Sequence, residues 1–138
     1  MRNLALLIIH YLTINNIIMR HRVRKNLKFN NKSFSHRDAM QRNLLSSFFL
    51  HKSIQTTEKK VQLIVPMVDK LINVVNTKDE MNAIRYVMKY LFTKEASLEL
   101  FKNVAPKYKG NKTSGFARAT AIKLRDGDNA KLVKLELV

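Results

Sequence analysis

Cysteine and tryptophan are absent from this 138-residue chain, which also holds only three glycines and two prolines. Without cysteine the chain can form no disulfide bond and no thiolate metal site, which fits a reducing compartment. The shortage of glycine and proline argues against long flexible linkers and low-complexity tracts. A chain of this length instead allows one domain with one modest core.

Acidic residues are also scarce. Ten Asp and Glu face 26 Lys and Arg, which gives a formal net charge of +16. Self-repulsion at this charge destabilises a compact state, so we expect a polyanionic partner, either nucleic acid or an anionic membrane. Residues 19–60 hold 11 cations and two acids, residues 61–105 six and five, and residues 106–138 eight and three. The nearly neutral middle is predicted to be the scaffold.

The first 18 residues form a separate extension with one cation, no acid and an apolar run over residues 4–9. The run is too short for a membrane span and lacks a signal-peptide cleavage pattern. Two interpretations remain open. The segment is either a weak organellar presequence, or the given start lies upstream of the real translation start at Met19. We favour the second, because Met19 opens the basic segment directly. Residues 19–33 are then predicted to be a basic arm that its partner orders, and residues 34–138 a single globular domain.

Helical periodicity follows the arm. Ser35 is predicted to cap a first helix that ends near residue 50. A short strand over residues 52–56 comes next, and Thr57 is predicted to cap a second helix with an apolar period of 3.6 residues. Pro66 lies inside that period. Because proline removes a hydrogen bond and clashes with the preceding turn, this helix should kink there or start later.

The rest of the chain predicts two more helices and a hairpin. A capping box at residues 77–80 begins the third helix, and Thr93 opens a fourth that ends before Pro106. Residues 115–125 and 131–138 alternate with a two-residue period around a DGDNA turn, which indicates an antiparallel hairpin with the earlier strand as its third member. The predicted fold is α+β, with about four helices packed on a small three-stranded sheet and an extended basic N-terminal arm.

A series of short motifs runs in one register from Met19 to Val138. They are Met19-Arg20-His21-Arg22, Ser35-His36-Arg37 with Ala39-Met40 and Arg42-Asn43, His51 with Ile54 and Thr56-Thr57, Gly115-Phe116 with Arg118, Gly127-Asp128-Asn129-Ala130, and Leu135-Glu136-Leu137. Each motif is weak alone, but together, in this order and at these separations, they are specific. In these residues the chain resembles the bacterial-type large-subunit ribosomal protein seventeen family.

The resemblance implies a structural constituent of the large ribosomal subunit that binds 23S-type ribosomal RNA near the polypeptide exit side, touches neighbouring ribosomal proteins and supports subunit assembly in translation. It implies no catalytic residue, cofactor, metal, small-molecule substrate or membrane partner, and a ribosome in the bacterial cytoplasm or in an organelle. The chain departs from the family pattern along its second helix, where Lys and Arg are usual, and after the GDNA turn. The departing residues are Gln62, Ile64, Val65, Pro66, Asn76, Lys131 and Leu132.

Basic side chains carry the expected chemistry. Lys and Arg neutralise phosphates and release counterions, so contact with about eight phosphates would make affinity fall roughly as the seventh power of salt concentration. Histidines can stack on bases or donate to phosphate and 2′-hydroxyl groups. The predicted RNA-binding residues are Arg20, His21, Arg22, Arg24, Lys25, Lys28, Lys32, Ser35, His36, Arg37, Arg42, Asn43, His51, Lys52, Lys60, Arg118, Lys123 and Arg125.

The phenylalanines are predicted to divide between two environments. Those expected in the core are Phe48, Phe49, Phe92 and Phe101. Those expected to be available for stacking on bases are Phe29 and Phe34.

Three rival classes of function have less support. An enzyme would need a cluster of acid, base or metal-binding groups, and the four histidines have no metal-ligand spacing. A nonspecific, nucleoid-type nucleic-acid-binding protein is supported by charge alone and is the main alternative. A membrane-surface protein would rest on residues 1–18 together with the basic arm.

Overall fold

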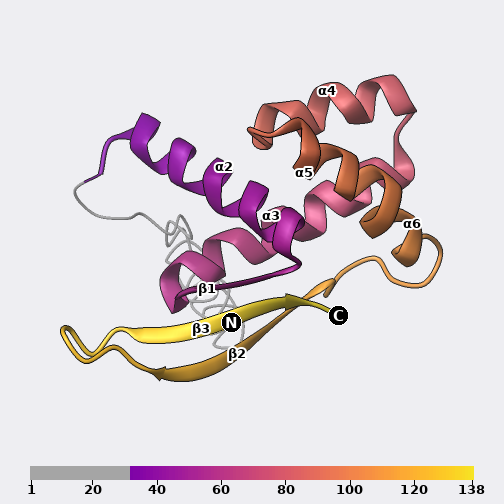
Figure 1. Ribbon diagram of the computed structural model, residues 1–138. Coiled ribbons are helices and arrows are strands. Elements are labelled where there is room, and N and C mark those ends of the chain that lie inside the picture. Colours follow the sequence, from indigo (N-terminus) through magenta and orange to yellow (C-terminus); the bar gives the residue numbers. More distant parts are fainter. Residues whose placement is uncertain (1–31) are drawn as a thin grey trace, which may run out of the picture.

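The computed structural model describes residues 32–138 (Figure 1). The extension over residues 1–18 and all but the last two residues of the predicted arm lie outside the described residues. The elements are α2 (Phe34–His51), β1 (Ser53–Thr57), α3 (Glu58–Thr77), α4 (Glu80–Tyr90), α5 (Lys94–Glu99), a π-helical turn η1 (Leu100–Val104), α6 (Ala105–Tyr108), β2 (Ala117–Leu124) and β3 (Lys131–Leu137). Because α5, η1 and α6 follow one another without a break, four helical segments pack with three strands, and the predicted α+β fold is confirmed.

The sheet has the strand order β1-β3-β2, and both of its pairings are antiparallel. The helices gather on one face of the sheet (Figure 1). Val133 and Leu135 of the central strand β3 are buried, and Leu135 lies opposite Ile54 of β1 and Ala119 of β2. The hairpin with the earlier strand added to it is therefore confirmed, with β3 at the centre.

The core lies between the helices and this sheet face. Phe48 and Phe49 are fully buried, as predicted, and their rings meet edge to face with centroids 5.6 Å apart. Burying a side chain of this size stabilises the fold by roughly 1.5–3 kcal/mol. Phe101 is partly buried against the core. The prediction for Phe92 is wrong, because its side chain is 48% exposed, whereas Phe34 is 78% exposed, which leaves it available for stacking.

The N-cap of α2 is Ser33, and the prediction of Ser35 is wrong. Ser33 has extended backbone angles, and its Oγ accepts the backbone N–H of His36 at 3.3 Å. Ser35 lies inside the first turn, where its Oγ only reaches the Ser33 hydroxyl at 3.2 Å. At the other end Lys52 is left-handed, with φ 61°, and its N–H donates to the carbonyl of Phe48 at 2.8 Å. The strand therefore starts at Ser53, one residue later than predicted.

The cap gives a direct test of this boundary. Replacing Ser33 with alanine should lower the free energy of unfolding by about 1 kcal/mol, because an N–H of the first turn loses its acceptor. The matched Ser35→Ala change should stay within about 0.5 kcal/mol, as for surface substitutions in general. Urea unfolding followed by circular dichroism measures both, and equal losses would place the cap elsewhere.

Helix α3 begins at Glu58, immediately after Thr57, and continues unbroken through Pro66. The Thr57 position as N-cap is confirmed, although its side chain makes no capping bond, and the alternative of a later start is wrong. Proline deprives the carbonyl of Gln62 of its usual partner. Both Gln62 and Pro66 are exposed, so water can satisfy that carbonyl. A bend at Pro66 stays a prediction.

Two other boundaries differ from the prediction. Thr77 ends α3, where its Oγ1 donates to the carbonyl of Asn73 at 2.7 Å, so the N-cap of α4 is Asp79 and no capping box forms. The fourth helical segment begins after Thr93, as predicted, but continues past Pro106. Pro106 lies in the first turn of α6, behind the π-helical turn, where a missing N–H costs little.

Candidate nucleic-acid interface

The predicted interface begins with the basic arm. Six of its candidate residues, Arg20, His21, Arg22, Arg24, Lys25 and Lys28, lie outside the described residues. Lys32, the first described residue, is exposed beside the Ser33 cap. The first turn of α2 contains no acid, so the positive end of the helix dipole adds to the cations around it. The arm therefore joins the folded body at an electropositive helix end.

Arg37 and Arg42 project from α2, and each is only partly exposed. The Nε of each is buried without a hydrogen-bond partner in the described part of the chain. The Arg42 guanidinium carbon lies 4.0 Å above the centre of the Phe92 ring. Buried Ser46 fixes this arrangement, because its Oγ accepts the N–H of Phe92 at 2.9 Å and donates to the carbonyl of Arg42 at 2.8 Å. A guanidinium held over a half-exposed ring leaves its terminal N–H groups for a phosphate or a base.

The other candidates near α2 differ in how free they are. Ser35, His36, Asn43 and His51 are exposed along the helix. Lys52 forms an ion pair with Glu99, Nζ to Oε1 at 3.0 Å. That bond, together with one from Asn103 at 2.7 Å, lowers the pKa of Glu99. The charge of Lys52 is therefore partly neutralised within the fold.

Lys60 lies in the first turn of α3 and is partly exposed. Within residues 32–138 it forms no ion pair. Its charge is therefore available to an external anion.

A β-bulge changes which candidates of β2 share a face. Arg118 lies opposite Glu136 and Thr120 opposite Lys134, but the register shifts between Ala121 and Lys123, so Lys123 lies opposite Leu132. Strict alternation would separate Lys123 from Arg118. The extra residue instead returns Lys123 to the face of Arg118, which is the face away from the buried Val133 and Leu135. The open face of the sheet thus gathers basic and polar side chains.

Arg125 is bound locally at the hairpin turn. Its guanidinium donates from Nε and Nη2 to the two carboxylate oxygens of Asp128. This bond, with a smaller contribution from the N–H of Ala130, lowers the pKa of Asp128 to about 2. Lys123 lies within 3.9 Å of Asp126. Of Arg118, Lys123 and Arg125, only Arg118 makes no ion pair within residues 32–138.

The Arg125 pair predicts a pH dependence. A carboxyl whose pKa is depressed in the folded state stabilises that state above its ordinary pKa, and the stabilisation is lost as pH falls through the folded value. For Asp128 the window is therefore between about pH 4 and pH 2. Arg125→Gln should raise the Asp128 pKa toward its ordinary value, measured by NMR titration of the side-chain carboxyl. An unchanged pKa would mean that the pair does not form in solution.

The described residues bear on two of the rival classes, the enzyme and the membrane protein. No group of three or more His, Asp or Glu residues among them could hold a metal ion. None of the helices within residues 32–138 is long and apolar enough to cross a bilayer.

The fold and its charges define a small, strongly basic α+β protein whose cations gather around α2 and on the open sheet face. A family model described as Ribosomal protein L17 matches residues 40–138. The chain belongs to this ribosomal protein family, which is structural and not enzymatic, and the resemblance seen in the sequence motifs is confirmed.

Bacterial relatives named large ribosomal subunit protein bL17 support the assignment. The one from Desulforapulum autotrophicum is 37% identical over 120 residues, covering 87% of this chain and 97% of the relative. The one from Clostridium kluyveri is 40% identical over 103 residues, covering 75% and 89%. The one from Geotalea daltonii is 35% identical over 107 residues, covering 78% of this chain but only 58% of the relative. The chain thus spans less than two thirds of some relatives and nearly all of others.

Proposed function

We propose that this chain is a structural constituent of the large ribosomal subunit and binds its ribosomal RNA. Membership of the L17 family is the observation that carries the proposal. The bacterial origin of the named relatives supports a bacterial-type ribosome, and their name supports the large subunit. Neighbouring proteins of that subunit are the further partners.

Charge supports RNA as the direct partner. The net charge is +16, and the five ion pairs within residues 32–138 leave most cations of that part without an acidic partner. We propose three contacts: the arm in RNA crevices, the Arg42–Phe92 stack with the N-terminal end of α2, and the open sheet face with Arg118 and Lys123. Lys and Arg on a rigid body fix its position on folded RNA through phosphates and shape.

Sedimentation of ribosomes from cells that express a tagged full-length chain tests the proposal. The chain should travel with the large subunit and stay there through a high-salt wash, because many phosphate contacts and protein neighbours act together. A nonspecific nucleic-acid-binding protein would instead be released by salt and spread over DNA and all RNA. Recovery in the membrane fraction, or absence from the large subunit, would overturn the proposal.

A further inference from the structure

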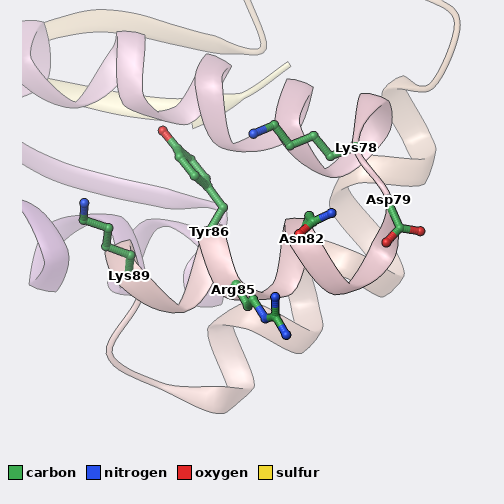
Figure 2. A pocket seen from close by; sticks show the side chains of 6 residues that line it. All are labelled: Lys78, Asp79, Asn82, Arg85, Tyr86 and Lys89. Carbon is green, nitrogen blue, oxygen red and sulfur yellow. The ribbon is translucent and has the colours of Figure 1, made fainter.

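The middle of the chain is nearly neutral in sequence, but its charges are segregated in space. Its cations gather beside α4, where a pocket of about 480 Å³ is lined by Lys78, Asp79, Asn82, Arg85, Tyr86 and Lys89. Figure 2 shows the Tyr86 ring standing between the side chains of Lys78 and Lys89. Asp79 is the one acid of the lining against three cations, so the pocket is electropositive. From the charge balance of the sequence, these residues were predicted to belong to the scaffold.

Tyr86 is the centre of this cluster. The Nζ of Lys78 lies 5.4 Å from its ring centre, and the Nζ of Lys70 from α3 lies 5.6 Å from it. The Tyr86 hydroxyl oxygen is covered by its neighbours, and the Lys70 ammonium and the Tyr90 hydroxyl lie close enough to interact with it. The pocket therefore offers a ligand the tyrosine ring and the surrounding cations.

The helix itself is electrostatically frustrated here. Arg85 and Lys89 lie one turn apart on α4, and like charges at this spacing repel each other. Asn82 and Tyr86 are also one turn apart on α4, and Tyr86 lies beside the buried Ala83 and Val87, since it packs partly against the core. The first turn of α4 adds backbone N–H groups, since Asp79 makes no side-chain capping bond. An anion with several oxygens would relieve the repulsion between Arg85 and Lys89 and accept hydrogen bonds from these N–H groups.

We infer that the pocket formed by Lys78, Arg85, Tyr86 and Lys89, with Lys70 beside it, is a second RNA-binding site that holds a backbone phosphate. The inference rests on the proposed function, since it takes ribosomal RNA as the ligand. A phosphate diester has two charged oxygens, which can accept hydrogen bonds from the cations that line the pocket. A neighbouring base can stack where the tyrosine ring and cations meet.

Filter binding of the full-length chain to deproteinised large-subunit ribosomal RNA, over a salt series, tests the site. The double variant Lys78→Gln/Lys89→Gln should flatten the salt dependence by about 1.5 units, because two phosphate contacts are lost. The matched control Lys94→Gln/Lys102→Gln removes equal charge from exposed lysines of α5 and η1 and should leave the slope close to wild type. Equal slopes for the two double variants would overturn the inference.

Tyr86→Leu separates the contribution of the ring from that of the charge. It should weaken binding about 3- to 10-fold, because a base loses its stacking surface. It should leave the salt slope unchanged, because no cation is removed, while circular dichroism shows the fold intact. Ultraviolet crosslinking of assembled large subunits should then recover RNA nucleotides on the wild-type peptide that contains Tyr86. Crosslinks to an acidic protein segment alone would overturn the inference, yet leave the proposed function standing. A wild-type chain without any preference for ribosomal RNA would instead contradict the proposed function itself.

Discussion

Deleting residues 1–31 is expected to lower affinity for large-subunit ribosomal RNA on the order of 10³-fold near ~0.15 M salt. The deletion removes five cations of the basic arm, and if each neutralises one phosphate the salt slope should flatten by about four units. Lys32 and Ser33 must be kept, because Ser33 caps α2. Binding measured at several salt concentrations gives both quantities.

A shorter deletion provides the control. Removing residues 1–18 takes away a single cation, so affinity and slope should stay close to wild type. Both deletions should melt at the temperature of the wild-type chain, because neither removes a described element. A salt slope that does not change when residues 1–31 are removed would contradict an RNA-binding arm.

Replacing Leu135 with aspartate is expected to unfold the domain. Leu135 is fully buried at the centre of the sheet, and an unpaired carboxylate there costs several kcal/mol. A small domain has only about 5–15 kcal/mol of stability in total, so the cooperative thermal transition should disappear or shift far downward. Circular dichroism during heating measures the change.

Ala119→Asp is the matched control for this change. Ala119 lies directly opposite Leu135 on the neighbouring strand β2 but is exposed. The same carboxylate should therefore remain hydrated there and cost less than about 1 kcal/mol, the range of strand propensities. Equal melting temperatures for the two variants would mean that Leu135 does not lie in the core.

Much of the fold could be predicted because apolar periodicity records which face is buried. The 3.6-residue spacing from Val61 onward predicted α3, and the two-residue spacing of Val133 and Leu135 predicted β3. The boundaries were less accessible. Ser33 and Ser35 carry the same side chain near the same helix end, and only the backbone conformation decides which one caps. Pro106 reads as a helix end, yet the π-helical turn before it allows the helical segment to continue.

The candidate site was predictable in its charge and less so in its arrangement. The sequence marks Arg42 as a candidate RNA-binding residue and Phe92 as an apolar residue, but it does not show that tertiary packing places one over the other. The bulge in β2 reverses the side of Lys123, and a two-residue period contains no signal for it. The cations around Tyr86 were hidden by averaging over residues 61–105, because four of the five acids in that stretch do not line the pocket. The repeat of Arg85 and Lys89 one turn apart was the available clue.

The position of β3 has a consequence for how the molecule is made. Strands β1 and β2 are each hydrogen-bonded to β3 and not to each other, and β3 follows both of them in the chain. Because synthesis is vectorial, at about 5–20 residues per second, neither earlier strand has a partner until residues 131–137 have been made. A chain cut before residue 131 would therefore leave β1 and β2 without the strand that joins them.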